Sequence, residues 1–452
     1  MLQLATAVLL LSAPPLARSD SVVAFVDVTV IPMDRERTIP RQTVVVRGGR
    51  IVVIGPSSQV KVPAGGLRVD GRGKFLIPGL AEMHAHIPGG DTPDSVVERT
   101  LFLYVAGGVT TIRGMLGHPR HLDLRARAAR NELLSPTIYT SGPSLNGNSV
   151  PTPGAAARIV AEQKAAGYDF LKIHPGISGE VFDTLAATAK RVGIRFAGHV
   201  PLQVGLARAL ETGYATIDHL DGYVEAMVRD GAPVTAAESE FFGLNLGEYL
   251  DESRLPGLVE ATRETQVWNV PTQVLMENLM PDVTVEVLQQ RPEMRYVAPT
   301  TLSKWAGEKS SLLRDAGASA ESARRTMSMR RKLIKALHAG KAGLLLGSDA
   351  PQIYNVPGFS VHRELQSLVA AGLTPYQALE TGTRNVAVFF GTAATTGTVG
   401  VGKRADLVLL DANPLTDVAN TTRRSGVMLR GRWLPKAEIE KRLASVAKSV
   451  GN

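Results

Sequence analysis

Cysteine is absent from this 452-residue sequence, and its absence excludes three kinds of chemistry. No disulfide can form, no thiolate can bind a metal, and no cysteine can act as a nucleophile. Any metal site must therefore use histidine, carboxylates or a rarer ligand. The G-x-S-x-G elbow of many serine hydrolases is also missing, so nothing in the sequence supports a serine acyl intermediate.

Aromatic residues make up only 5% of the chain. The formal charge of +8 invites a nucleic-acid interpretation, but the densest basic runs, Arg324-Arg325 and residues 330–332, lie in a helix-like stretch without aromatics. A solvated helix face explains these runs, so we expect no nucleic-acid partner. A milder alternative is that the basic surface attracts anionic substrates.

Long apolar runs are scarce, and the most pronounced one lies at the N-terminus. LATAVLLLSAPPLA is followed by Ala17-Arg18-Ser19, which fits a small-x-small cleavage site. This predicts a signal peptide over residues 1–19 and a periplasmic or secreted protein. Because no lysine or arginine precedes the run, a buried or frayed N-terminal segment is the alternative. The run is short for a membrane span, so we expect no stable membrane insertion after signal removal.

Alternating, β-branched patterns occur at both ends of the chain. VVAFVDVTVI and TVVVRGGRIVVIG stand near the N-terminus, with Gly48-Gly49 as a hairpin turn, and ADLVLLD and GVMLRGRWL stand near the C-terminus. We expect the two segments, residues 20–77 and 388–452, to pair with each other and to flank an inserted domain.

Between these ends, short apolar runs alternate with helix-periodic stretches. About eight strand candidates follow one another in βα order, which is typical of a parallel sheet closed into a barrel. We therefore predict a (β/α)₈ TIM-type barrel over residues 78–387. Residues 276–331 are too long for an ordinary connection and are predicted to form a helical insertion near the barrel mouth.

Polar side chains occupy the carboxyl ends of several predicted strands, where such barrels place their active sites. His84 and His86 follow one strand and face the same way, because side chains alternate along a strand. His199, His219 and Asp349 follow three others. A lone histidine is usually a satisfied core residue, but four histidines and an aspartate at strand ends favour bound metal ions as the common partner.

Lys172 also ends a predicted strand, in FLKIH. An ammonium group there would be repelled by the proposed metal ions. A deprotonated lysine can add carbon dioxide and become an anionic carbamate whose two oxygens bridge two metals. The alternative is a lysine at the barrel rim whose stem packs while its charge reaches water.

Together these motifs resemble the metal-dependent amidohydrolase superfamily, in its imidazolonepropionase-like and Xaa-Pro-dipeptidase-like branch. The resemblance covers nearly the whole mature chain and is carried by PGLAEMHAH, FLKIH, AGHVP, TIDHL, LLGSDAP, LVAAGLTPYQALETGTRNVAVFFG and GTVGVGKRADLVLLDANPL. It implies that the terminal strands form a composite β-sandwich. It further implies a ligand set in which His84, His86 and Asp349 bind a buried metal, His199 and His219 bind an outer one, and carboxylated Lys172 bridges both.

The chemistry expected from this resemblance is hydrolysis of an amide bond by two divalent ions, with zinc the expected metal. Such ions lower the pKa of a bridging water and polarise the scissile carbonyl. Asp349 would carry a proton from the resulting hydroxide to the leaving amine. The expected substrate is a small molecule such as a dipeptide, an N-acyl amino acid or an aromatic amino-acid amide.

Two further residues are candidates for substrate binding. Tyr223 lies four residues after His219, where its hydroxyl could reach the substrate, and a packing role is the equal alternative. His174 shares a strand face with Lys172 and is predicted to contact substrate or support a ligand.

Three readings of function stay open at this point. The same site would serve a lactone, carbamate or phosphotriester hydrolase, because fold does not fix function. A metal- or ligand-binding barrel without turnover is the other alternative, although the intact Asp349 argues against it. The sequence also leaves the oligomeric state open, with a homo-oligomer among the alternatives.

Overall fold

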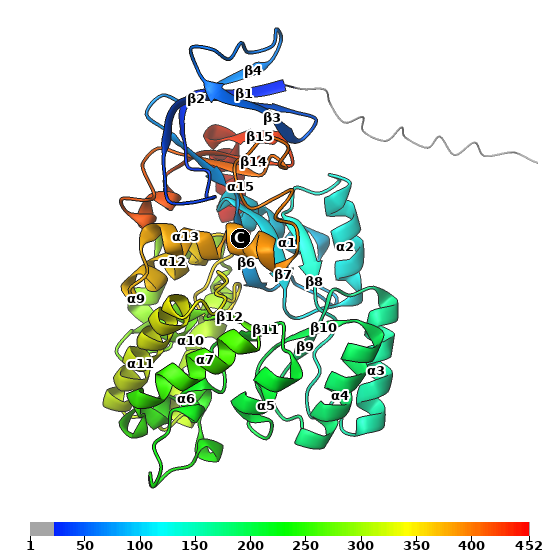
Figure 1. The fold of residues 1–452 in the computed structure, drawn as a ribbon, viewed down its shortest axis with the longest axis vertical. Helices are drawn as coiled ribbons and strands as arrows, with labels where there is room; N and C mark the ends of the chain where they lie inside the picture. Colours follow the sequence, from blue (N-terminus) through cyan, green and yellow to red (C-terminus); the bar gives the residue numbers. More distant parts are fainter. Residues whose placement is uncertain (1–21, 452) are drawn as a thin grey trace, which may run out of the picture.

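A computed structural model describes residues 22–451 (Figure 1). The predicted signal peptide, residues 1–19, lies outside the described residues. Across residues 22–451, no helix combines the length and apolar character needed to cross a membrane.

Strands from both ends of the chain form one eight-stranded sheet, at the end of the molecule where blue and red segments meet in Figure 1. Its members are β1 (Val22–Val30), β2 (Ile39–Arg47), β3 (Arg50–Pro56), β4 (Leu67–Asp70), β5 (Phe75–Pro78), β13 (Leu407–Leu410), β14 (Arg424–Leu429) and β15 (Arg432–Pro435). β5 pairs antiparallel with β13, which joins the N-terminal strands to the C-terminal ones. The expected pairing between the chain ends is therefore present, and the finer assignment as a sandwich stays a prediction.

The turn between β2 and β3 follows the sequence expectation. Gly48 and Gly49 take φ values of 56° and 76°, and Arg47 pairs with Arg50 across the turn. Two consecutive left-handed residues suit a tight hairpin, and glycine adopts that conformation without strain.

Two parallel sheets make up the inserted domain. The first contains β6 (Leu80–Ala85), β7 (Val109–Gly114) and β8 (Thr137–Thr140), and the second contains β9 (Phe170–Ile173), β10 (Arg195–Gly198), β11 (Thr216–Asp218) and β12 (Trp268–Val270). Helices follow most of these strands: α1 (Asp94–Ala106), α2 (Pro119–Ala129), α3 (Pro153–Ala166), α4 (Gly179–Val192), α5 (Gly205–Thr212) and α7 (Leu255–Glu264). The βα alternation read from the sequence is thus present along this stretch.

The predicted eighth strand, in LLLGSDAP, is not a regular strand. It is extended chain with isolated parallel bridges, Leu344 to Asn269 of β12 and Ala350 to Ala85 of β6. Backbone bonds accompany them: Leu345 donates to the Asn269 carbonyl at 2.9 Å, and His86 donates to the Ala350 carbonyl at 2.8 Å. The segment therefore connects the two parallel sheets on one side. On the other side, Gly142 donates to the Phe170 carbonyl at 2.9 Å.

Helices dominate the predicted insertion at residues 276–331. They are α8 (Gln273–Asn278), α9 (Val285–Gln289), η4 (Pro292–Tyr296), α10 (Pro299–Asp315) and α11 (Ala320–Ala339). A second excursion, which the sequence did not reveal, contains α6 (Tyr223–Ala226) and the 3₁₀ segments η1 (Ala236–Glu238), η2 (Phe241–Tyr249) and η3 (Glu252–Arg254). The domain boundaries expected from the sequence, at residues 77/78 and 387/388, stay predictions.

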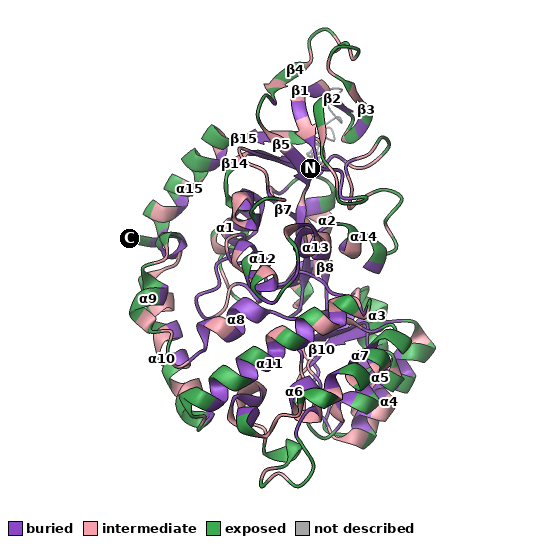
Figure 2. Cartoon of the chain, turned by 60° about the vertical axis from the view of Figure 1, so that its left-hand side comes forward, coloured by how far each residue is buried: buried purple, intermediate pink, exposed green. Residues whose placement is uncertain are grey.

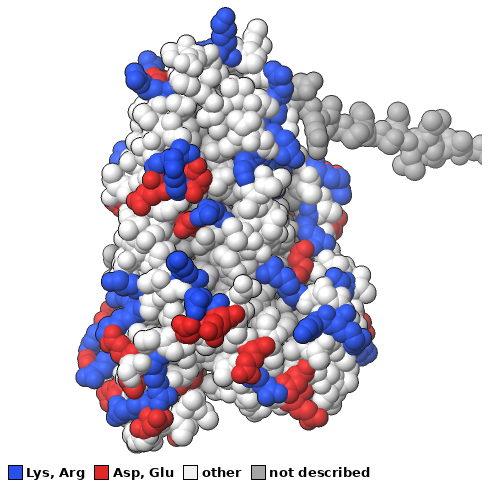
Figure 3. All heavy atoms as spheres, viewed as in Figure 1, with Lys and Arg blue, Asp and Glu red and all other residues white. Residues whose placement is uncertain are grey.

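The remaining helices lie in the C-terminal third of the chain: α12 (Ser360–Ala370), α13 (Pro375–Thr381), α14 (Arg384–Phe389) and α15 (Lys436–Gly451). Burial separates two main apolar cores, one in the inserted domain and one within the terminal sheet. In Figure 2 the outer helices, α11 among them, alternate between buried and exposed residues, as helices packed on one side do. On the face drawn in Figure 3, basic and acidic side chains are intermixed; the expected lack of a nucleic-acid partner stays a prediction.

Candidate metal centre

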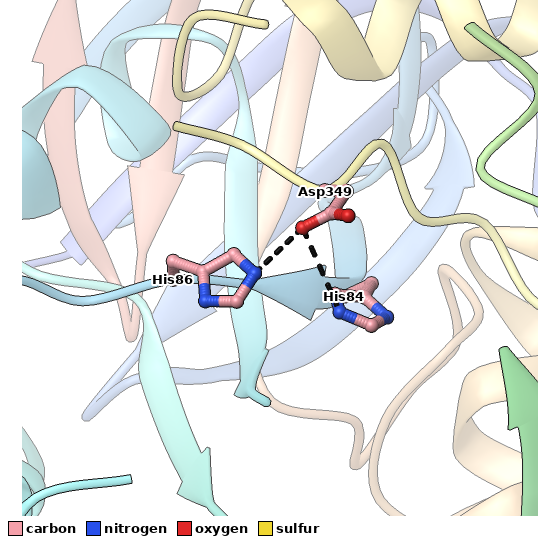
Figure 4. A group of neighbouring side chains, drawn as sticks. All are labelled: His84, His86 and Asp349. Atoms are coloured by element: carbon pink, nitrogen blue, oxygen red, sulfur yellow. Dashed lines mark hydrogen bonds and ion pairs between the residues drawn. The ribbon is translucent and has the colours of Figure 1, made fainter. Parts of the chain in front are cut away.

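The end of β6 and the segment after Ser348 bring three predicted ligands together (Figure 4). His84 lies in β6, and His86 follows directly after that strand. Nε2 of His86 lies 2.6 Å from Oδ1 of Asp349, and Nε2 of His84 lies 3.6 Å from the same oxygen. One ligand atom from each residue falls within 4.8 Å of the others, so the group can hold a metal ion.

The other three predicted ligands stand beside this group. Nζ of Lys172, in β9, lies 3.4 Å from Nε2 of His84. The ring centroid of His219 is 4.6 Å from that of His84 and also 4.6 Å from that of His199. Gly198 precedes His199 with φ of 123°, and a Cβ there would lie 2.9 Å from Cδ of Lys172. The same Cβ would lie 2.5 Å from the carbonyl oxygen of Ile173, so glycine is required where this strand end passes β9.

His84 is oriented by a buried charged network behind it. Its Nδ1 lies 2.9 Å from Oδ2 of Asp218, the last residue of β11. Asp218 also accepts from Arg113 at 3.1 Å and from the Thr216 hydroxyl at 2.6 Å. Asp218 is within ion-pair distance of Nδ1 without hydrogen-bond geometry, and Nε2 of His84 faces Lys172 and Asp349 on the other side of the ring. A carboxylate behind a metal-binding histidine is a common arrangement.

The two remaining imidazoles have partners of the same kind. Nδ1 of His199 lies 2.7 Å from Oδ2 of Asp221, and Nδ1 of His219 lies 2.8 Å from Oγ1 of Thr272. With Nδ1 protonated, each ring donates to its neighbour and keeps the Nε2 lone pair for another partner. In that tautomer, His199 and His219 both present the form that a metal requires.

Protonation states fit the same role. Burial, and then the nearby Lys172, lower the pKa of His199 to about 3 and that of His84 well below its ordinary value. Burial and the neighbouring imidazoles lower the pKa of His219. Burial raises the pKa of Asp349, but the contacts with His84 and His86 and the nearby Lys172 outweigh it and hold that pKa below the ordinary value. Neutral imidazoles and an ionised carboxylate are the forms that bind metals.

The sequence matches the amidohydrolase family over residues 75–434. The chain belongs to the amidohydrolase family. As a member, it is a hydrolytic enzyme that acts on carbon–nitrogen bonds. No curated relative matches the sequence.

Solved structures share the fold of this amidohydrolase. A prolidase-like protein from Bifidobacterium longum superposes with a TM-score of 0.69 at 24% identity, covering 94% of this chain and 99% of its own. A bottromycin amidohydrolase gives a TM-score of 0.69 at 21% identity, covering 95% and 91%. A Xaa-Pro dipeptidase with bound methionine in its active site gives 0.66 at 16% identity, covering 92% and 100%. At these identities the likeness establishes the fold alone.

Lys172 is the one cation inside the cluster of this amidohydrolase, and its side chain is 1% exposed. Burial lowers its pKa, while Asp218 and Asp349 partly oppose that shift. The shortest polar contact of Nζ, to Nε2 of His84, is a long 3.4 Å. In these surroundings the charged ammonium form of the amine is unfavourable, so conversion to an uncharged or anionic form is favoured.

Glu82 connects two of the ligand-bearing segments. One of its carboxylate oxygens accepts from the backbone N–H of His84 at 3.2 Å and of Ser348 at 2.7 Å, and the other accepts from the Ser348 hydroxyl at 2.6 Å. Burial raises its pKa to about 8. Glu82 therefore holds the end of β6 and the segment that carries Asp349 in a fixed relation.

The two predicted substrate residues take different places. His174 is half-buried, its ring centroid lies 4.9 Å from that of His199, and its Nδ1 contacts the Ser144 hydroxyl. Tyr223 is the first residue of α6, and its hydroxyl forms a hydrogen bond with the Thr262 hydroxyl at 2.7 Å. Both substrate roles stay predictions, and the placement of the Tyr223 hydroxyl favours packing.

Several supporting residues escaped the sequence analysis. Asp218 and Asp221 flank His219 in the TIDHLD stretch, and an acid next to a ligand histidine was the only available signal. Thr272 and Glu82 gave none, because each contributes through a partner far away in the sequence.

Proposed function

We propose that this amidohydrolase is a binuclear enzyme that cleaves the amide bond of a dipeptide, an N-acyl amino acid or an aromatic amino-acid amide. One observation carries the proposal. Six ligand-type side chains lie close together, and Nδ1 of His199 and of His219 already has a hydrogen-bond partner. The six are His84, His86, Lys172, His199, His219 and Asp349.

The donor set fits two divalent ions. His84, His86 and Asp349 would hold one, and His199 and His219 would hold the other. Nitrogen and carboxylate donors suit zinc, and one tetrahedral zinc needs only about four ligands. Bound together, such ions lower the pKa of a water and polarise a carbonyl.

Lys172 would join the two halves as a carbamate. Its neutral amine attacks carbon dioxide, the new N–C bond forms, and one amine proton leaves to solvent. The product is an anion with two oxygens. Its formation would replace a buried cation, which would repel the metal ions, by a group that attracts them. The burial and lowered pKa of Lys172 support this step.

Asp349 would move the proton that amide cleavage requires. It would accept a proton from the attacking water and deliver it to the nitrogen of the departing amine. Its Oδ1 faces His86, while Oδ2 is 3.3 Å from the Gln352 amide nitrogen that donates to it. The carboxylate is therefore held from both sides.

We further propose that the seven parallel strands and the extended segment 344–350 form one closed (β/α)₈ barrel. The bridges from Leu344 to β12 and from Ala350 to β6 support closure on one side. Bridges from Ser141 and Leu145 to β9 support it on the other. A closed barrel gathers all its strand ends around one axis, which brings distant ligands to one place.

A substrate screen tests the proposed function. Zinc-loaded protein is assayed with dipeptides, N-acyl amino acids, lactones and phosphotriesters, and kcat/KM is compared between classes. We expect amides to give the highest values. A lead of at least tenfold for lactones or phosphotriesters would replace the proposal with that alternative, and no turnover of any class would favour a binding barrel.

A further inference from the structure

An aromatic residue from the excursion after β11 stands against the predicted outer ligands. The ring centroid of Phe242, in η2, lies 5.4 Å from that of His219 and 6.3 Å from that of His199. The side chain is only half-buried, so part of the ring is accessible to solvent.

The backbone that presents Phe242 is fixed. Phe242 and Gly243 both take left-handed conformations, with φ of 57° and 71°. A Cβ on Gly243 would lie 2.5 Å from Cγ1 of Val224, so glycine is required there. The Thr326 hydroxyl of α11 donates to the Gly243 carbonyl at 3.0 Å, and the Ser322 hydroxyl donates to that of Leu244 at 2.8 Å. Left-handed backbone at a bulky residue is costly and persists only where the surroundings impose it.

An apolar cluster lies behind the ring. Phe241 contacts Phe242 edge-on at 4.7 Å between centroids, and both pack on buried residues that include Met276, Met327 and Ile353. Ile353 follows Asp349 by four residues, so the cluster extends from the outer histidines to the chain that carries the proton-transferring aspartate. Apolar side chains therefore lie next to the predicted metal ligands on the side of Phe242.

We propose that Phe242 is a specificity-determining residue that packs against an apolar, preferably aromatic, group of the substrate next to the scissile bond. The inference rests on the proposed function and names the side chain that sets its substrate class. A carboxylate placed against the face of this ring would lose hydration without gaining a partner, whereas a phenyl group gains aromatic contact. Amides with a small or anionic group at this position are accordingly expected to be poor substrates.

Binding of two metal-chelating probes tests the proposal without turnover. Acetohydroxamate and benzohydroxamate share the chelating group and differ only in methyl against phenyl. Calorimetry on the zinc-loaded enzyme compares their Kd values for the wild type, Phe242→Ala and Phe242→Leu. Phe390→Ala is the matched control, because Phe390 is also half-buried but stacks on Tyr139 at 3.7 Å and approaches Phe170, where β9 begins.

We expect the wild type and Phe390→Ala to prefer benzohydroxamate by about tenfold, Phe242→Ala to lose most of that preference, and Phe242→Leu to fall between. The kcat/KM ratio for N-benzoyl against N-acetyl amino acids should follow the same order. An unchanged probe ratio in Phe242→Ala, or no preference in the wild type, overturns the inference. A Phe242-dependent preference without turnover of any amide overturns the proposed function, and what then remains is that Phe242 contacts the apolar group of a bound ligand.

Discussion

Asp349 is the single residue whose side chain has two tasks in the proposed reaction, metal binding and proton transfer. Asparagine at this position keeps one ligating oxygen but has no basicity. We expect Asp349→Asn to lower kcat for amides by roughly 10²- to 10⁴-fold, the usual contribution of general acid–base catalysis. Metal content, measured by elemental analysis, should fall only in part.

A leaving-group comparison separates the two tasks. A p-nitrophenyl ester releases its phenolate without a proton, so it should lose much less activity than an amide in Asp349→Asn. Equal losses for both substrates, with the metals still bound, would show that Asp349 does not protonate the leaving amine. His174, whose ring lies 4.9 Å from that of His199, would then be the first replacement to test.

Lys172 gives a second residue-level prediction. Lys172→Ala removes the proposed carbamate and should lose most of the metal and most of the activity. Because a short carboxylic acid supplies the same two oxygens, adding one to the assay should restore part of the turnover. Full metal content and wild-type kcat in Lys172→Ala would exclude a bridging role.

The sequence could predict the inner residues of this site because each stands at a strand end with a recognisable neighbour. The His-x-His spacing identifies His84 and His86 as a pair on one strand face. Lys172 is identified because its ammonium group would be repelled by the expected metal ions. Thr272 could not be found in that way. Its contact with His219 depends on the backbone of two neighbouring strand ends, and no local pattern encodes that relation.

Helix α11 also contacts the site. The basic run at residues 330–332 was expected on a solvated helix face, and for Arg330 this is wrong: the residue is 1% exposed, because it donates from this helix to the carbonyl of His219 at 2.7 Å and to that of Pro271 at 3.0 Å. His219 and Thr272 both take left-handed conformations, with φ of 64° and 45°. Arg330 thus holds two strained strand ends in the arrangement that pairs His219 with Thr272.

Replacing Arg330 tests this connection. Arg330→Met leaves two buried carbonyls without their donor, so the free energy of unfolding should fall by about 3 kcal/mol, and zinc should bind more weakly. Arg324→Met, on an exposed part of the same helix, is the control and should change stability by less than about 0.5 kcal/mol. Urea unfolding and zinc titration provide the measurements. Equal effects of the two variants would contradict the positioning role.

The elements themselves were predictable to different degrees. The apolar run FLKIH predicted the strand β9, because a short buried strand is encoded by its local sequence. The segment LLLGSDAP was also predicted to be a strand, but it is extended chain without regular pairing. Its pairing is limited to isolated bridges, and the chain turns at Asp349, where φ is 64°. The η2 segment was missed because 3₁₀ turns lack a strong period.

For the whole molecule, the structure predicts a loss of stability in acid. His121 is fully buried, and burial lowers its pKa to about 4. In the unfolded chain its pKa returns to about 6.5, so between these values the unfolded chain binds a proton that the folded one does not. The contribution of neutral His121 to the free energy of unfolding is therefore fully present above about pH 6.5. It is lost as the pH falls toward 4, and the loss amounts to up to about 3 kcal/mol.

Urea unfolding at several pH values, with chelator present throughout, measures this loss. The control variant His121→Leu removes the titrating group, so its stability should fall less steeply between pH 6.5 and 4 than that of the wild type. Parallel curves for the two proteins would show that His121 does not contribute to the acid sensitivity.

In the proposed reaction, two metal ions act together at the ends of the parallel strands. To test this, metal-free protein is titrated with zinc while hydrolysis of its best amide substrate is followed. We expect activity to rise until two equivalents per chain have been added and then to stay constant. Full activity at one equivalent, or activity that does not depend on metal, would contradict it.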